Sequence, residues 1–179
     1  MRSNQRVPRG VTNMPGELNG ESVIFLKVTP GYVEKAISNA KGKPNVTQVE
    51  PVFGRHDVAV RGNFRDLAEL HRLQATLGSD FVRGFQAYPA VQEYVKIRPN
   101  GQPVSSWILI RTNDPQRVAS EIKKVPGIEG LIGTVGNFDL LARFGAEQQD
   151  ALMQTVLRKI QTISGVKATE TLPAFSTQF

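Results

Sequence analysis

The chain has 179 residues, of which 40% are hydrophobic and 21% charged, and its formal net charge is +6. This composition is typical of a globular protein and excludes a largely disordered chain. The absence of cysteine excludes disulfides and thiolate metal sites, and the only histidines are His56 and His71. Two histidines leave little for a metal or acid-base site, so we expect neither a metal nor a cofactor.

The longest apolar runs, such as residues 107–110, have the length of a strand and are too short to span a bilayer. No charged-then-apolar leader opens the sequence, so we expect a cytoplasmic protein without a membrane partner. We find no serine with a placed base, no prominent carboxylate pair and no glycine-rich phosphate loop. His71 lies between Leu70 and Leu73, where a histidine at a core edge or at the surface is the default. We therefore expect that the protein is not an enzyme.

The positive charge permits an acidic partner such as nucleic acid. The clearest one-sided stretch is the beginning of the chain, where Arg2, Arg6 and Arg9 precede the first acid, Glu17. Residues 1–20 are rich in glycine, proline and asparagine, and we expect a flexible arm that is too short for a helix-turn-helix domain. A solvated basic surface explains the charge more simply than direct binding of nucleic acid through this arm, which remains an alternative.

Periodicity and turn residues predict the order β-α-β-β-α-β over residues 21–89. Residues 22–28 are apolar almost throughout, as in a central strand. Apolar residues then recur at helical spacing from Val33 to Ala40 and again from Leu67 to Leu77. The predicted strands are residues 22–28, 46–53, 56–61 and 81–88.

The same order repeats over residues 105–179, and a proline follows the last strand in both halves, Pro89 and Pro173. Between the halves we expect a linker at residues 90–104, which contains a turn-rich break and has room for an extra strand over residues 91–98. The strands of the second half are predicted at residues 106–112, 128–135, 138–144 and 166–172, with one helix that begins at Pro115 and another over residues 147–163. This repetition predicts an internal duplication.

Two tandem βαββαβ units predict an α+β fold of two ferredoxin-like plaits, each an antiparallel sheet with helices on one face. Strands with apolar residues on both faces need a cover for the second face. The other half of the chain is the nearest cover. We therefore expect the halves to pair through their sheets about a pseudo-two-fold axis, as in a dimer of single units.

One hairpin sequence recurs in both halves, at residues 136–139 (Gly-Asn-Phe-Asp) and at residues 54–57 (Gly-Arg-His-Asp). Glycine at a tight turn supplies a positive φ, and an aspartate just beyond it can bond to the turn backbone. This structural explanation accounts for the motif by itself, and the recurrence indicates only that the hairpin was duplicated.

The strand order, the hairpin at residues 136–139 and the closing stretch at residues 165–172 (Gly-Val-Lys-Ala-Thr-Glu-Thr-Leu) resemble the effector-binding domain of the Lrp/AsnC family. Residues 124–128 (Lys-Val-Pro-Gly-Ile) are also typical of that domain, between its first helix and its second strand. The resemblance covers residues 106–175 well and residues 22–91 more loosely. The chain thus resembles two tandem copies of the domain without the helix-turn-helix domain of the family.

In that family, which regulates amino-acid metabolism, this domain binds a free amino acid and sets the oligomeric state, while a helix-turn-helix domain binds DNA. The resemblance implies a site where a carboxylate binds the ammonium of the amino acid and N–H and hydroxyl groups bind its carboxylate. Carried over by position, the ligand-binding candidates are Gly136, Asn137, Phe138 and Asp139 on the hairpin and Thr169 and Thr171 on the last strand.

The first half departs from this pattern. It has residues 85–87 (Phe-Gln-Ala) in place of the threonine-bearing strand and His56 in place of Phe138. We therefore expect the second half to bind the ligand and treat Gly54, His56 and Asp57 as a degenerate or structural copy. A plain role of Thr169 and Thr171 as β-branched strand residues is an equal alternative.

These features predict a stand-alone effector-binding and assembly protein that modulates transcription by oligomerising with itself or with DNA-binding relatives. Two alternatives stay open, a nucleic-acid-binding basic plait and a ligand-free assembly module. Residues 83–88 (Arg-Gly-Phe-Gln-Ala-Tyr) resemble part of the aromatic strand of RNA-recognition domains, but they fall on the fourth strand instead of the third. Binding of RNA is therefore a minor alternative.

Overall fold

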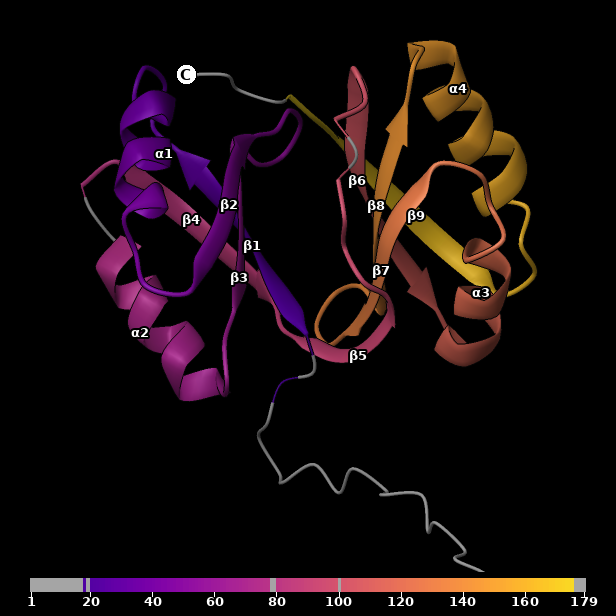
Figure 1. The fold of residues 1–179 in the computed structure, drawn as a ribbon, viewed down its shortest axis with the longest axis horizontal. Helices are drawn as coiled ribbons and strands as arrows, with labels where there is room; N and C mark the ends of the chain where they lie inside the picture. The colour runs from indigo at the N-terminus through magenta and orange to yellow at the C-terminus, as the bar shows by residue number, and fades with distance from the viewer. Residues whose placement is uncertain (1–17, 19, 78–79, 100, 176–179) are drawn as a thin grey trace, which may run out of the picture.

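The computed structural model describes residues 18, 20–77, 80–99 and 101–175, so Arg2, Arg6 and Arg9 lie outside the described residues. Two antiparallel sheets face each other in the middle of the molecule, and the helices cover their outer faces (Figure 1). In the described part of the chain, no helix is long and apolar enough to cross a membrane.

The first half forms a four-stranded sheet in the order β2-β3-β1-β4. The apolar run of the sequence becomes the central strand β1, and the helical stripe of α1 buries Ala36, Ile37 and Ala40 against the sheet. The elements are β1 (Glu21–Val28), α1 (Val33–Lys41), β2 (Val46–Pro51), β3 (Val58–Asn63), α2 (Leu67–Leu77) and β4 (Val82–Tyr88).

The second half repeats this arrangement in a five-stranded sheet with the order β5-β7-β8-β6-β9. Helix α3 begins with Pro115, and the side chain of Asp114 accepts a hydrogen bond from the backbone N–H of Arg117 as a helix cap. The elements are β5 (Ala90–Val95), β6 (Val104–Thr112), α3 (Pro115–Ile122), β7 (Ile128–Thr134), β8 (Leu140–Ala146), α4 (Gln149–Gln154), the π-helical turn η1 (Thr155–Ile160) and β9 (Val166–Ala174).

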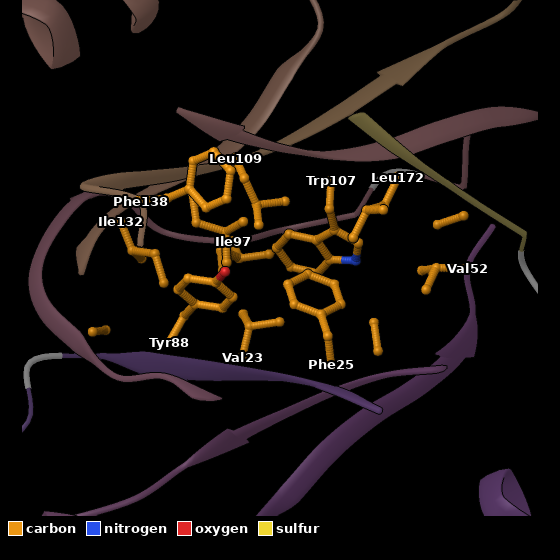
Figure 2. Close-up of a cluster of buried hydrophobic side chains, with 14 residues drawn as sticks. Val23, Phe25, Val52, Tyr88, Ile97, Trp107, Leu109, Ile132, Phe138 and Leu172 are labelled. Carbon is orange, nitrogen blue, oxygen red and sulfur yellow. The ribbon is translucent and has the colours of Figure 1, made fainter. Parts of the chain in front are cut away.

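The predicted α+β fold of two tandem ferredoxin-like plaits is confirmed, and so is the pairing through the sheets. A core of fourteen residues from both halves fills the space between the sheets (Figure 2). Its aromatic side chains cross the interface, because the rings of Phe25 and Trp107 meet edge to face at 6.1 Å. In each half, one further core lies between the sheet and its own helices.

The segment predicted as a linker, residues 90–104, contains strand β5, which follows β4 after a single residue, Pro89. Strand β4 belongs to the first sheet and β5 pairs with β7 in the second, so the chain crosses between the sheets at this proline. The end of β9 makes the corresponding crossing in the other direction, since Ala174 pairs with Val52 next to β2. Each half thereby adds backbone to the edge of the other half.

Candidate functional site

The two hairpins with the repeated Gly-x-x-Asp sequence have the same backbone conformation. Gly54 has φ of +120° and Gly136 has φ of +128°, a region that side chains with a Cβ atom rarely adopt. The glycine therefore makes the turn in both halves.

The aspartates of the hairpins tie them to the central strands. Asp57 Oδ2 accepts a hydrogen bond from the backbone N–H of Val28 at 2.8 Å, and Asp139 Oδ2 accepts one from the N–H of Thr112 at 2.8 Å. We expected a bond to the turn backbone itself, and the structure places it instead at the end of β1 or β6. The structural role of the motif is thus to fix the hairpin beside the central strand.

The second carboxylate oxygen distinguishes the two aspartates. Asp57 Oδ1 lies 3.1 Å from the ammonium group of Lys27. Among the residues that the structure describes, Asp139 Oδ1 has no hydrogen-bond or ion-pair partner. The first hairpin is therefore neutralised by its own half, and the second hairpin retains a carboxylate oxygen that no described residue pairs with.

Arg111 lies beside the second hairpin, and sequence reasoning missed it. Its Nε donates a hydrogen bond to the carbonyl oxygen of Asn137 at 3.2 Å, and its guanidinium lies 5.7 Å from the ring centroid of Phe138. The side chain is otherwise exposed. The internal repeat could have pointed to Arg111, since Arg111 occupies the position in β6 that Lys27 occupies in β1. A carboxylate and a guanidinium thus flank one exposed turn.

The aromatic positions of the two hairpins point inward and belong to the core. Phe138 is buried between the sheets, with its ring centroid 6.4 Å from that of Tyr88. His56 is buried with its ring 5.4 Å from Phe25. Burial, together with the charges of Arg55 and Lys27, lowers the pKa of His56 below its ordinary value.

The threonines of the last strand lie on a different side of the sheet from Phe138. Thr169 and Thr171 pair with Ile110 and Ile108, which belong to the core under the helices, and directly paired residues share a face. Thr169 Oγ1 accepts a hydrogen bond from Gln161 Nε2 at 2.8 Å. Within one chain, the structure therefore does not bring the threonines together with residues 136–139.

The hairpin that contacts β9 is the first one. Arg55 forms an ion pair with Glu170 at 2.6 Å, and the N–H of Phe53 donates to the carbonyl oxygen of Pro173 at 2.9 Å. Each hairpin thus lies over the last strand of the other half, as the contact of Phe138 with Tyr88 shows for the second hairpin. Residues 136–139 and the threonines of β9 were expected at one site, but they lie apart because each hairpin contacts the last strand of the other half.

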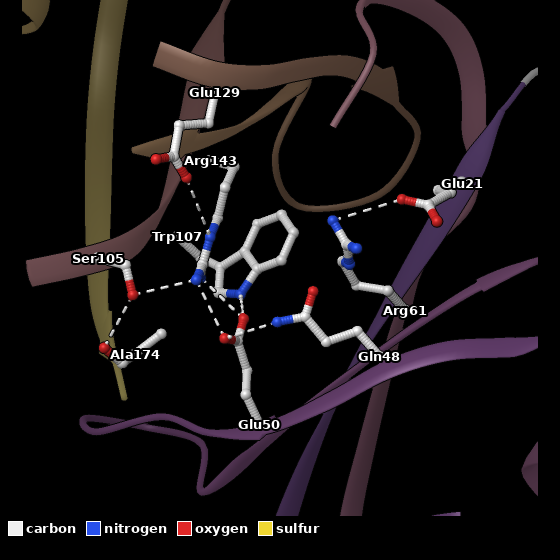
Figure 3. A network of polar contacts seen from close by, with 9 residues as sticks. All are labelled: Glu21, Gln48, Glu50, Arg61, Ser105, Trp107, Glu129, Arg143 and Ala174. Carbon is white, nitrogen blue, oxygen red and sulfur yellow. Dashed lines mark hydrogen bonds and ion pairs between the residues drawn. The ribbon is translucent and has the colours of Figure 1, made fainter. Parts of the chain in front are cut away.

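A buried polar group between the sheets was also missed by sequence reasoning (Figure 3). Its centre is the ion pair between Glu50 Oε1 and Arg143 Nη1, 2.8 Å apart and 93 residues apart in the sequence. No local sequence signal links residues so distant along the chain. In the described part of the chain, no cluster of three or more metal-ligating side chains is found.

One family model matches the second half of the chain. Residues 106–178 match the family model of the Lrp/AsnC ligand binding domain. The resemblance drawn from the sequence is confirmed by this match for the second half, and the first half repeats the same plait. A comparison with curated protein sequences gave no match.

Solved structures include similar proteins of several kinds. TTHA0845 from Thermus thermophilus is 29% identical and covers 41% of this chain and 95% of its own, with a TM-score of 0.40. AsnC of E. coli is 19% identical over 63% of this chain and 72% of its own, with a TM-score of 0.42. The siroheme decarboxylase NirDL is 8% identical over 86% of this chain and 70% of its own, with a TM-score of 0.66.

The likeness to NirDL extends over both halves and concerns the fold alone. Because that protein is an enzyme and the second half of this chain matches a ligand binding domain, the fold does not decide between catalysis and regulation. The Lrp/AsnC ligand binding domain favours a regulatory role, and the absence of catalysis stays a prediction.

Proposed function

We propose that this chain is a stand-alone effector-binding and assembly protein of the Lrp/AsnC type. It binds a small amino-acid-like ligand at the second hairpin and acts on transcription in the cytoplasm by assembling with itself or with DNA-binding relatives. Residues 21–89 and 105–179 are its two domains, joined by residues 90–104. The match of the second half to the Lrp/AsnC ligand binding domain is the observation that carries the proposal.

The second hairpin offers complementary groups for both charges of an amino acid. Asp139 Oδ1 accepts the ammonium group, since no described residue occupies it. The N–H groups of Arg111 that do not bond to Asn137 donate to the ligand carboxylate. Apart from its chain neighbours, no described residue lies within 4 Å of the place where Gly136 would carry a Cβ atom, so a ligand can approach its backbone.

The first hairpin is a degenerate copy in this account. The ammonium group of Lys27 already pairs with Asp57 Oδ1, which is the counterpart of the oxygen proposed to bind the ligand. Arg55 is held by Glu170. Gly54, His56 and Asp57 therefore keep a structural role.

Assembly brings Thr169 and Thr171 into the account, because within one chain β9 lies against the other hairpin. A second copy is needed to place these threonines beside residues 136–139. Exposed apolar side chains around the hairpins support such contacts, since Phe53 is 59% and Phe175 50% exposed although their rings pack at 4.8 Å.

Thermal unfolding of the full chain with a panel of amino acids tests the ligand. A cognate amino acid at about a hundred times its Kd raises the unfolding midpoint by roughly 5–10 °C, from the mass-action and size relations. Size-exclusion chromatography with light scattering on the same samples reports assembly. No stabilisation by any amino acid, with no change of size, contradicts the proposal, and a ligand-independent oligomer favours the assembly-module alternative.

The variant Asp139→Asn tests the position of the ligand. Asparagine keeps an oxygen that accepts from the N–H of Thr112 but removes the charge, so the affinity for the cognate amino acid falls roughly 10- to 100-fold. The matched control is Asp57→Asn in the first hairpin, which leaves the affinity unchanged. Equal losses in both variants would place the ligand elsewhere.

A further inference from the structure

The interface between the two sheets has a polar end built around Glu50 of β2 (Figure 3). Its carboxylate accepts hydrogen bonds from Arg143 Nη1 at 2.8 Å and Nη2 at 3.0 Å and from the indole N–H of Trp107 at 2.8 Å. Glu50 is 2% and Arg143 3% exposed. A bidentate ion pair therefore joins the two halves inside the core.

The second half holds Arg143 from the other sides. Its Nη2 donates to Ser105 Oγ at 3.0 Å, and that hydroxyl donates in turn to the carbonyl oxygen of Ala174 at 3.0 Å. The guanidinium lies 5.0 Å from the ring centroid of Trp107, at cation–π distance. The second half thus supplies a fixed cation and the carboxylate of Glu129, 4.0 Å from Arg143 Nε, and the first half supplies the bidentate carboxylate (Figure 3).

A comparison of equivalent positions in the two halves shows that neither half contains all the residues of this polar group. Arg143 pairs with Trp107 across β8 and β6, and its counterpart Arg61 pairs with Val23 across β3 and β1. The arginine is present in both halves, and the tryptophan in one.

The acid is likewise present in one half only. Glu50 pairs with Ala59 in the first sheet, and the counterpart pair in the second sheet is Ile132 with Leu141. The position that provides the carboxylate in the first half therefore carries an isoleucine in the second.

Pairing of two second halves is disfavoured by charge. Arg143 would meet Ile132 of the other copy, and the guanidinium and the indole N–H of Trp107 would lose their shared acceptor. Arg143 would keep only the 4.0 Å contact of its Nε with Glu129 Oε2 of its own half, and loss of the bidentate partner of a buried charge is destabilising.

Pairing of two first halves is disfavoured by volume. Val23 would stand in both sheets where Trp107 now packs against Phe25, leaving a cavity at the centre of the interface. Arg61, the counterpart of Arg143 in the first half, makes fewer close polar contacts than Arg143 does. Among described residues its Nε and Nη1 have no hydrogen-bond partner, and the nearest carboxylate is that of Glu21 in its own half, at 3.4 Å.

We propose that the sheet faces form a coded pair, in which each half accepts the other half of this chain and rejects a second copy of itself. Glu50 on one side and Arg143 with Trp107 on the other are the residues that determine this specificity. The sheet face is thus closed to single-domain relatives that lack an acid in the place of Glu50, and assembly with them uses the hairpins, strand edges or helices. This inference stands whether or not a ligand binds.

Unfolding midpoints of full-chain variants test the ion pair. Glu50→Ile, which installs the residue of the second half, lowers the midpoint by roughly 10 °C, and Arg143→Met does the same. The double variant regains part of the loss, because it removes both charges of the Glu50 pair but also takes the 4.0 Å contact with Arg143 Nε away from Glu129 Oε2. The control is Glu170→Gln, which removes the exposed pair with Arg55 and shifts the midpoint by at most about 2 °C. A Glu50→Ile midpoint equal to that of the unaltered chain would overturn the proposal.

Engineered cysteines test the choice of partner, since the chain contains none of its own. Val52 and Ala174 face each other in a bridge whose flanking hydrogen bonds define a closely spaced pair, so Val52→Cys with Ala174→Cys forms a disulfide within the chain. Thr134→Cys with Ala174→Cys reports pairing of two second halves, because Thr134 is the counterpart of Val52 and pairs with Ala90 here.

Thr134 and Ala174 are buried, so contacts at the outer surface do not join them. After refolding at high concentration, we expect no disulfide-linked dimer from this second cysteine pair in the otherwise unaltered chain. With Glu50→Ile and Arg143→Met added, the same cysteine pair forms such a dimer. Abundant dimers in the otherwise unaltered chain, or none after removal of the ion pair, would contradict the coded pairing.

Discussion

The aspartates of the two hairpins make the same backbone hydrogen bond and differ in a single contact. Lys27 neutralises Asp57, whereas Arg111 bonds to the carbonyl oxygen of Asn137 and leaves Asp139 Oδ1 without a described partner. The two hairpins therefore differ through one basic residue at the end of the central strand. Lys27 pairs with the aspartate of the first hairpin, whereas Arg111 leaves the aspartate of the second hairpin available to a ligand.

His56 makes the molecule sensitive to acid. Burial lowers its pKa in the folded chain below the ordinary value of about 6.5, so the unfolded chain takes up the proton more readily. The contribution of neutral His56 to stability is complete above pH 6.5 and is lost as the pH falls from there through the lower folded-state pKa. Urea unfolding at a series of pH values measures this loss.

The variant His56→Phe installs the residue of the second hairpin, Phe138, and removes a buried Nδ1 that has no described partner. We expect a free energy of unfolding at neutral pH that is unchanged or higher by about 1–2 kcal/mol. We also expect a smaller decrease between pH 6.5 and 5. Parallel pH profiles of the two proteins would show that His56 is not the group responsible.

The turn glycines set the geometry of the hairpins as elements. Gly136→Ala forces a Cβ atom into a left-handed conformation with open space around it, so it costs about 1–2 kcal/mol of stability. Gly54→Ala carries the same strain and also brings its Cβ atom to 3.0 Å from Leu172 Cδ2 of the other half. Denaturant unfolding measures both, and a larger loss in Gly136→Ala than in Gly54→Ala would contradict this packing.

The elements of both plaits were predictable because their signals are local. Apolar runs gave the central strands, helical stripes such as Val33 to Ala40 gave the helices, and apolar residues on both sheet faces predicted a second layer. Strand β5 was left open as an extra strand in the linker, because its hydrogen bonds lie with β7, about forty residues further along the chain.

The candidate site was less predictable for the same reason. The sequence indicated the turn and Asp139, but Arg111 reaches the hairpin from the neighbouring strand. The exchange of hairpins between halves also separates residues 136–139 from Thr169 and Thr171 within one chain. Such contacts depend on how strands are paired and crossed, and sequence spacing does not contain that information.

The whole molecule behaves as one structural unit, because the core between the sheets takes residues from both halves. The single tryptophan, Trp107, lies in that core, so its fluorescence reports the interface directly. We expect the fluorescence and the far-UV circular dichroism to change together in one denaturant transition. An earlier fluorescence transition would indicate halves that separate before they unfold.

The central claim is that duplication produced two unequal halves, of which the second binds the effector. The stoichiometry of binding tests it most directly, by isothermal titration of the full chain with the amino acid that stabilises it best. The account predicts one ligand per chain, lost in Asp139→Asn and retained in Asp57→Asn. Two equivalent ligands per chain, or one that depends on Asp57, would contradict it.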